Sequence, residues 1–234
     1  MSKRIIVYID GFNLYYGAIK GTPYKWLDLV KLAENIIGGN PNIVLLRYFT
    51  AKVKPPSWDT DKAMRQQIYL DALCGVGKIK IHFGKFKQRE KKGLLSKAIS
   101  QKCGACGNAV LFPSGTGVSI TAPEEKGSDV NLASYLLLDA AQDRFDMAWV
   151  ISNDSDLSTP VRLAREEFSK KVGVVFYSQM LSAQKASPQR MSRELFFAAG
   201  NVHLYLHEKH LVKSLFPDEF VDASGRRHRK PKAW

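Results

Sequence analysis

The chain has 234 residues, enough to bury a full core, and its 45% hydrophobic and 24% charged content is typical of a soluble globular protein. No apolar run approaches the roughly 20 residues that span a bilayer, and no signal-peptide core is present, so we expect a cytoplasmic protein without membrane segments. Three cysteines, an odd number, argue against a disulfide framework. The formal net charge of +13 predicts a surface that attracts polyanions, of which nucleic acid is the commonest large one in a cytosol.

The first half of the chain predicts alternating strands and helices. Residues 4–10 form a continuous apolar run, typical of a strand buried on both faces. Residues 26–37 have helical periodicity and stop at two glycines, residues 42–51 form a second buried strand, and residues 61–75 predict a helix. Residues 78–86 alternate basic and apolar side chains, which favours a half-exposed or edge strand.

The second half continues the alternation. Residues 127–145 predict a long helix, 147–152 a strand, 157–168 a helix and 171–177 another strand. Strands that alternate with helices indicate βαβ units, in which a parallel sheet is covered on both faces. We therefore predict an α/β fold, a three-layer α/β/α sandwich with a central, mainly parallel, Rossmann-like sheet.

Two segments do not follow this alternation. Residues 88–123 are too long for an ordinary connection, so we expect an insertion with a function or disorder of its own. We predict a main domain over residues 1–207 that carries this insertion, followed by a basic C-terminal tail over residues 208–234. The end of the tail, "SGRRHRKPKAW" from Ser224, is predicted to be flexible.

The insertion contains Cys103 and Cys106 in the Cys-x-x-Cys-Gly form of a zinc knuckle. A structural zinc site needs four ligands, and Cys74 and His82 are the remaining nearby candidates in the sequence. The pattern leaves open an intramolecular Zn²⁺ site, a knuckle completed by another subunit, and a vestigial knuckle.

Aspartates follow the predicted strands at their carboxyl ends, where open parallel sheets bind ligands. Asp10 ends the first strand, and Asp154 and Asp156 follow the strand over residues 147–152. Asp129 opens a helix, and it can join the others only if that helix begins near the same edge of the sheet. Each aspartate alone could be a helix cap or part of a turn. A gathering of carboxylates needs a cation, and oxygen ligands alone suit Mg²⁺ or Mn²⁺.

Three sequence blocks carry a resemblance to a known family. "YIDGFNLYYG", "EEKGSDVNLASYLLLDAA" and "WVISNDSDLSTPVRLARE" occur in this order. Together they resemble the signature blocks of the NYN domain, in its LabA-like branch within the PIN-like nuclease superfamily. The resemblance covers residues 4 to about 206, with the insertion outside it, and implies a PIN-like sheet with an acidic pocket for Mg²⁺ or Mn²⁺.

The resemblance also implies roles for individual residues. It assigns the acids of the pocket, an accompanying amide and a hydroxyl to the following positions: Asp10, Asn13, Asp129, Ser152, Asp154 and Asp156. All six would serve catalysis or substrate binding, the four aspartates as metal ligands and Ser152 toward the substrate. Family topology places the start of the Asp129 helix at the pocket. Lys126, three residues earlier, is a candidate phosphate contact, although an ordinary exposed lysine explains it equally well.

We therefore predict a metal-dependent endoribonuclease. A divalent ion lowers the pKa of a bound water and offsets charge on the scissile phosphate, and the resemblance implies 5′-phosphate and 3′-hydroxyl products. The preference for RNA comes from the family alone, so DNA and a homo-oligomer stay open. A single strand would need positive charge and aromatic faces, and Phe12, Tyr15 and Tyr16 follow Asp10, although we expect two of the three in the core.

Two other functions compete with this prediction. A non-catalytic RNA-binding module would keep the fold and the basic surface, and the intact acids argue against it. A phosphatase of the haloacid dehalogenase type also starts with an apolar strand that ends in aspartate. Such enzymes need a second acid two residues later, where this chain has Phe12.

Overall fold

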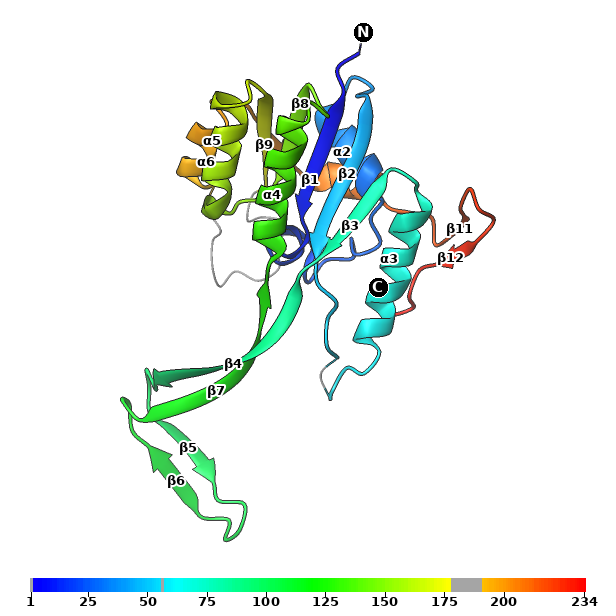
Figure 1. Cartoon of the computed structure of the whole chain (residues 1–234). Coiled ribbons are helices and arrows are strands. Elements are labelled where there is room, and N and C mark those ends of the chain that lie inside the picture. Colours follow the sequence, from blue (N-terminus) through cyan, green and yellow to red (C-terminus); the bar gives the residue numbers. More distant parts are fainter. Residues whose placement is uncertain (1, 56, 178–190) are drawn as a thin grey trace. The chain divides into compact units, whose positions relative to one another are not determined.

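The computed structural model describes residues 2–55, 57–177 and 191–234 (Figure 1). These residues divide into two compact units. The main unit comprises Met1–Lys85 and Gly127–Trp234, and the hairpin extension comprises Phe86–Lys126. In the part of the chain described, no helix has the length and apolar character needed to cross a membrane.

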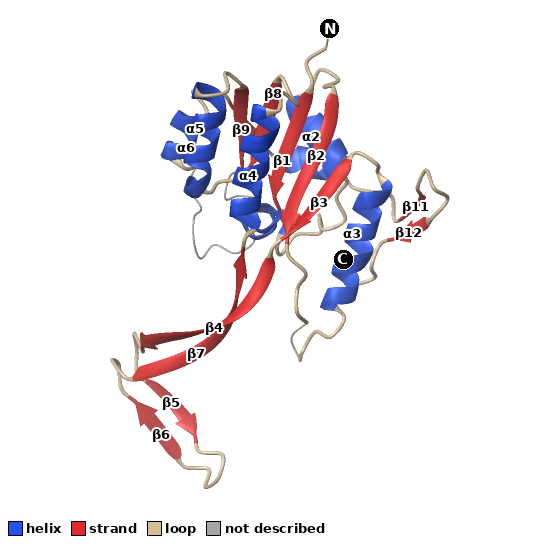
Figure 2. Ribbon diagram, in the orientation of Figure 1, coloured by secondary structure: helices blue, strands red, loops and turns tan. Residues whose placement is uncertain are grey.

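A six-stranded sheet forms the centre of the main unit (Figure 2). Its strands lie in the order β10 (His203–Leu206), β9 (Lys171–Tyr177), β8 (Met147–Ile151), β1 (Ile5–Asp10), β2 (Ile43–Thr50) and β3 (Ile79–Phe83). All neighbouring strands pair in parallel, which confirms the predicted sheet. The strand predicted at an edge is β3, and it does lie at one edge.

Helices cover both faces of this sheet, so the fold has the three layers predicted for a PIN-like protein. One hydrophobic core joins the sheet to α4 (Ser128–Ala141), α5 (Ser158–Glu166) and α6 (Arg193–Ala198). The other joins it to α2 (Leu29–Ile37), α3 (Lys62–Gly75) and α7 (Glu208–Lys213). Strand β1 alternates strictly between the two cores, because successive side chains of a strand point to opposite faces. Figure 1 shows α4 and α2 on opposite faces.

The hairpin extension is built from strands rather than disordered chain. Strand β4 (Lys85–Leu94) and β7 (Gly117–Lys126) form one two-stranded sheet. Strand β5 (Ile99–Lys102) pairs antiparallel with β6 (Ala109–Phe112) in another. Nearly every residue of β4 is exposed, so its lysines and arginine face solvent.

The prediction of a flexible end from Ser224 is wrong. The chain after α7 forms a hairpin of β11 (Glu219–Val221) and β12 (Arg227–Arg229). His228 on β12 is buried and contacts Asp222 at 2.8 Å. The ring of Trp234 packs against Trp26, with centroids 6.3 Å apart. The basic composition of the tail hides these few aromatic anchors, whose burial stabilises the segment against its loss of conformational entropy.

Candidate metal centre

Three aspartates meet at the carboxyl edge of the sheet. Asp10 ends β1, Asp154 follows β8, and Asp129 lies in the first turn of α4. One carboxylate oxygen from each lies within 4.8 Å of the others. Strands β1 and β8 are neighbours, and β1 is also where the chain order of the sheet reverses, the place at which such sheets bind ligands.

Asp10 is held by hydrogen bonds to both of its oxygens. Oδ1 accepts from the backbone N–H of Asn13 at 3.0 Å, so Asp10 is the N-cap of the short helix α1 (Gly11–Leu14). Oδ2 accepts from the hydroxyl of Ser152 at 3.1 Å. A local cap and a contact from the end of β8 therefore fix the orientation of the carboxylate.

Ser152 links two of the acids. Its Oγ donates to Asp10 and accepts from the backbone N–H of Asp154 at 3.1 Å. The side chain is fully buried in the protein without substrate. Its hydrogen bonds hold the two aspartates, and the predicted substrate contact stays a prediction.

The loop after β8 explains the different positions of its two acids. Asp154 caps the one-turn 3₁₀ helix of Ser155–Leu157, and its Oδ1 accepts from the backbone N–H of Asp156 at 3.0 Å. Among the described residues, the group with mutually close ligand atoms contains Asp154 and not Asp156, whose side chain is exposed. Asp156 contacts Asp154 through its backbone, and its predicted role as a metal ligand stays a prediction.

Two amides join the loop to its surroundings. The side-chain oxygen of Asn13 accepts from the backbone N–H of Asn153 at 2.9 Å. The buried side chain of Asn153 donates to the backbone oxygen of Tyr177 at 3.2 Å, which ties the end of β8 to the end of β9. The sequence analysis missed Asn153, although it lies inside the "SNDSD" stretch that was singled out.

Asp129 reaches the cluster because α4 begins at this edge of the sheet. Gly127 precedes the helix with φ of 99°, a left-handed conformation that glycine adopts without steric cost. The helix N-terminus carries partial positive charge, which favours a carboxylate in its first turn. The strand pattern left the place of Asp129 open, and the resemblance put it with the other acids. The structure brings Asp129 together with Asp10 and Asp154.

The pKa of Asp10 lies well above its ordinary value. Burial raises the pKa of Asp10 to about 7, although the hydrogen bond from the Asn13 N–H lowers it. The charges of Asp129 and Asp154 add to the rise. The hydrogen bonds that hold Asp10 come from an amide and a hydroxyl, which do not neutralise a carboxylate beside two others. This donor set, oxygen from three carboxylates, fits a hard divalent cation such as Mg²⁺ or Mn²⁺.

The remaining predicted residues lie in the hairpin extension. Lys126 ends β7 and pairs with Glu124 at 3.3 Å, within the extension itself. Cys103 and Cys106 lie in the turn between β5 and β6. Within the extension as described, no third metal-ligating side chain joins this pair. A role for Lys126 and zinc binding at the cysteines stay predictions.

Cys103 and Cys74 are expected to react with alkylating agents at different pH, because their pKa values shift in opposite directions. Backbone N–H groups of Cys106 and Ala105 lower the pKa of Cys103, whereas partial burial raises the pKa of Cys74. Iodoacetamide should therefore label Cys103 at lower pH than Cys74, as mass spectrometry of the peptides would show. Protection of Cys103 by Zn²⁺ would favour a knuckle that binds metal. Equal labelling of both cysteines across the pH range would contradict the prediction.

The fold and the site define an α/β protein whose parallel sheet carries an acidic cluster fitted to a divalent cation. The chain belongs to the NYN domain family, whose model matches residues 4–196. It is 31% identical over 191 residues to 6-hydroxy-3-succinoylpyridine 3-monooxygenase HspA of Pseudomonas putida, covering 74% of this chain and 59% of that protein. It thus spans less than two thirds of this relative's length.

A solved structure supports the fold alone. A protein of unknown function from Vibrio parahaemolyticus superposes with a TM-score of 0.53 at 16% identity. The match covers 92% of this chain and 97% of that one.

Proposed function

We propose that this protein is a metal-dependent endoribonuclease that hydrolyses phosphodiester bonds at its aspartate cluster. The observation that carries the proposal is the trio of Asp10, Asp129 and Asp154, whose carboxylate oxygens lie within 4.8 Å of one another at the switch point of an NYN-family sheet. A hard dication that also carries substrate phosphates is the usual use of such a site.

Each residue of the site has a definable part in this chemistry. The three aspartates would hold Mg²⁺ or Mn²⁺, which when bound offsets charge on the scissile phosphate and activates water. Ser152 and the Asn13 backbone orient the Asp10 carboxylate. The Asn13 side chain holds the loop that carries Asp154. This supporting shell fixes the ligand oxygens before the ion arrives, which is what a tight, specific metal site requires.

The proposed substrate is RNA, with a single strand favoured. The net charge of +13 attracts a polyanion, and exposed cations concentrate on β4. Those that would contact phosphates without regard to sequence are Lys85, Lys87, Arg89, Lys91 and Lys92. Two of them, Arg89 and Lys91, also lie within 3.6 Å of Glu124, so their contribution would be smaller.

The name of the Pseudomonas relative raises a second reaction class, oxygenation of a pyridine ring. Non-haem iron sites that activate oxygen typically use two histidines and one carboxylate. Among the described residues, the group of possible metal ligands consists of three aspartates, which suits hydrolysis better than oxygenation. A wild-type protein that hydroxylates a pyridine substrate and does not cleave RNA would favour the oxygenase.

Cleavage of a labelled single-stranded RNA and a matching DNA tests the proposal. We expect RNA cleavage with Mn²⁺ or Mg²⁺, none with chelator, and a loss in Asp154→Asn of roughly 10²–10³-fold. Asp61→Asn, an exposed aspartate of the same unit, is the matched control and should cleave normally. Salt-sensitive binding without cleavage in the wild type would instead establish an RNA-binding module.

A further inference from the structure

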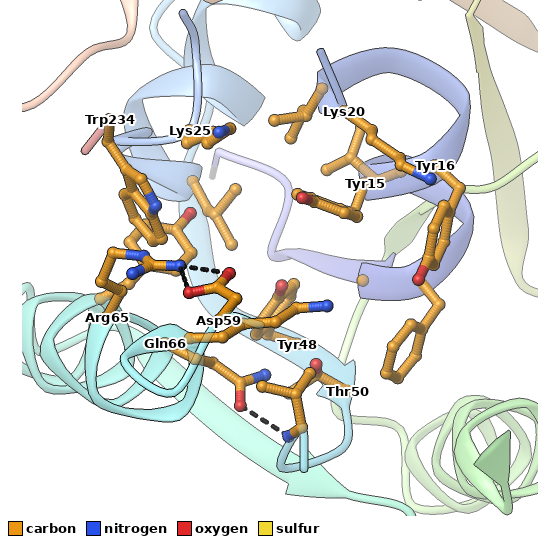
Figure 3. Close-up of a pocket in the computed structure, with 18 of the residues that line it drawn as sticks. Tyr15, Tyr16, Lys20, Lys25, Tyr48, Thr50, Asp59, Arg65, Gln66 and Trp234 are labelled. Atoms are coloured by element: carbon orange, nitrogen blue, oxygen red, sulfur yellow. Dashed lines mark hydrogen bonds and ion pairs between the residues drawn. The ribbon is translucent and has the colours of Figure 1, made fainter. Parts of the chain in front are cut away.

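A cavity of about 290 Å³ lies in the main unit (Figure 3). Its walls come from α1, the π-helical turn Tyr15–Ile19, β2, α3 and the chain's last residue, Trp234. Figure 3 shows the rings of Tyr15, Tyr48 and Trp234 arranged around it. None of the three aspartates is among its lining residues.

The cavity lies next to Asp10 in the fold. Asp10 is the N-cap of α1, and the next two residues, Gly11 and Phe12, already line the cavity. A side chain at Gly11 would meet the Phe49 backbone oxygen at 2.6 Å and the Tyr48 ring at 2.7 Å. The absence of a side chain at Gly11 therefore lets α1 lie directly on Tyr48. Asp10 also pairs with Phe49 on β2, the residue after Tyr48, so the cavity lies next to the strand ends that carry the candidate metal centre.

The walls of the cavity carry net positive charge. The cationic residues among the described lining are Lys20, Lys25, Lys62 and Arg65. Asp59 is the one carboxylate side chain among them, and both of its oxygens lie 2.6 Å from Arg65. Nζ of Lys20 lies over the ring of Tyr16 at 4.9 Å, and together with Lys25 and Lys62 it gives the cavity positive charge that a purely apolar ligand would not need.

Aromatic faces complete the lining. The rings of Phe12 and Tyr16 lie nearly parallel, at 16°, with centroids 6.4 Å apart. Tyr16 is 51% exposed, with Lys20 over its ring, and Trp58 is 81% exposed, so a ligand can reach both rings and Trp58 is the more open of the two. Of the three aromatic residues after Asp10, Tyr15 packs against the core, Phe12 is half-buried and Tyr16 is exposed. Exposed aromatic rings beside cations bind bases through stacking and phosphates through charge.

We propose that this cavity binds one nucleotide unit of a single strand, next to the phosphate that the aspartates hold. The base stacks on Tyr16 or Trp58, and the lysines contact the phosphate on its far side. The inference rests on the proposed function, because it takes the strand to be the substrate of the metal centre. It adds that cleavage depends on an unpaired base, since a base inside a duplex cannot enter the cavity.

Nucleotide binding can be tested without cleavage. Asp154→Asn in chelator is titrated with 5′-UMP, uridine, a short oligouridylate and nicotinate, and binding is followed by calorimetry and tryptophan fluorescence. We expect 5′-UMP and the oligonucleotide to bind, uridine to bind more weakly, and the fluorescence change to be lost in Trp58→Phe. Tyr16→Ala should weaken binding roughly tenfold, and Lys62→Gln should weaken 5′-UMP more than uridine. Phe197→Ala, at an aromatic residue on α6 whose exposure lies between those of Tyr16 and Trp58, should have no effect.

The outcomes separate this inference from the proposed function. Nucleotide binding without cleavage by the wild type would leave the cavity assigned and overturn the nuclease. Cleavage unaffected by Tyr16→Ala and Lys62→Gln would keep the nuclease and overturn the cavity. Binding of nicotinate in place of nucleotides would assign the cavity to small aromatic acids, and binding of 5′-UMP alone would assign it to a free nucleotide. Both results contradict the proposal.

Discussion

Asp10→Asn is expected to lower metal-dependent cleavage strongly and, at the same time, to stabilise the metal-free protein at neutral pH. The carboxylate is buried beside Asp129 and Asp154, and in the folded state without metal its ionisation is opposed by burial and by their charge. Asparagine removes that charge while its oxygen still caps α1, and the hydroxyl of Ser152 can accept from the new amide. Cleavage should fall by roughly 10²–10³-fold, since one ligand of the ion is lost.

The same shift sets the pH dependence of the metal-free wild type. The pKa of Asp10 is about 7 when folded and 3.8 in its ordinary state, so the folded protein binds the proton more tightly. The contribution of Asp10 to the free energy of unfolding is therefore fully present below pH 3.8 and is lost as the pH rises toward 7. At about 1.4 kcal/mol for each pKa unit, the loss is on the order of 4 kcal/mol. Divalent metal should restore stability most strongly at the upper end of this range, because binding needs the ionised carboxylate.

Chemical denaturation between about pH 4 and 8, in chelator and in Mn²⁺, would measure both effects. Asp61→Asn, an exposed aspartate of the same unit, serves as the control and should follow the wild type. An Asp10→Asn variant that is less stable than the wild type at pH 7 in chelator would contradict the assignment. So would a variant whose stability keeps the pH dependence of the wild type.

The sequence predicts the sheet and the acids at its edge because both depend on local patterns. A continuous apolar run indicates a buried strand, and the end of a parallel strand marks the ligand-binding edge, which is how Asp10 and Asp154 were found. Asp129 needed the resemblance, since the strand pattern alone does not say at which edge α4 begins. The difference between Asp154 and Asp156 depends on a single 3₁₀ turn, in which one acid caps and the other faces solvent.

The cavity could not be predicted in this way. Its lining combines short segments around Phe12, Lys25, Tyr48 and Arg65 with Trp234 at the far end of the chain. None of these segments has a pattern of its own, and only the packed fold brings them together. The same long-range packing orders the C-terminal segment, whose basic composition alone predicted a flexible tail.

A buried ionic network connects the sheet to the helix that carries Asp129. Asp139, on α4, is fully buried and accepts from Nε and Nη2 of Arg47 on β2 at 2.7 and 2.8 Å. The hydroxyl of Tyr8 on β1 donates to it at 2.7 Å. Burial opposes ionisation, yet Arg47 and Tyr8 together lower the pKa of Asp139, so it stays charged. Because Tyr8 lies two residues before Asp10, this network sets the position of α4 relative to the first ligand.

Asp139→Asn is therefore expected to lower the free energy of unfolding by about 3–5 kcal/mol, because it leaves the buried Arg47 guanidinium without a counterion. Asp71→Asn breaks the surface pair with Arg226 and should cost under about 1 kcal/mol, which makes it the matched control. Urea unfolding measures both. Where Asp139→Asn is still folded, calorimetry with Mn²⁺ should show weaker binding, since α4 no longer holds Asp129 in place. Unchanged metal affinity would mean that the network stabilises the fold without positioning the site, and equal losses in both variants would contradict the buried pair.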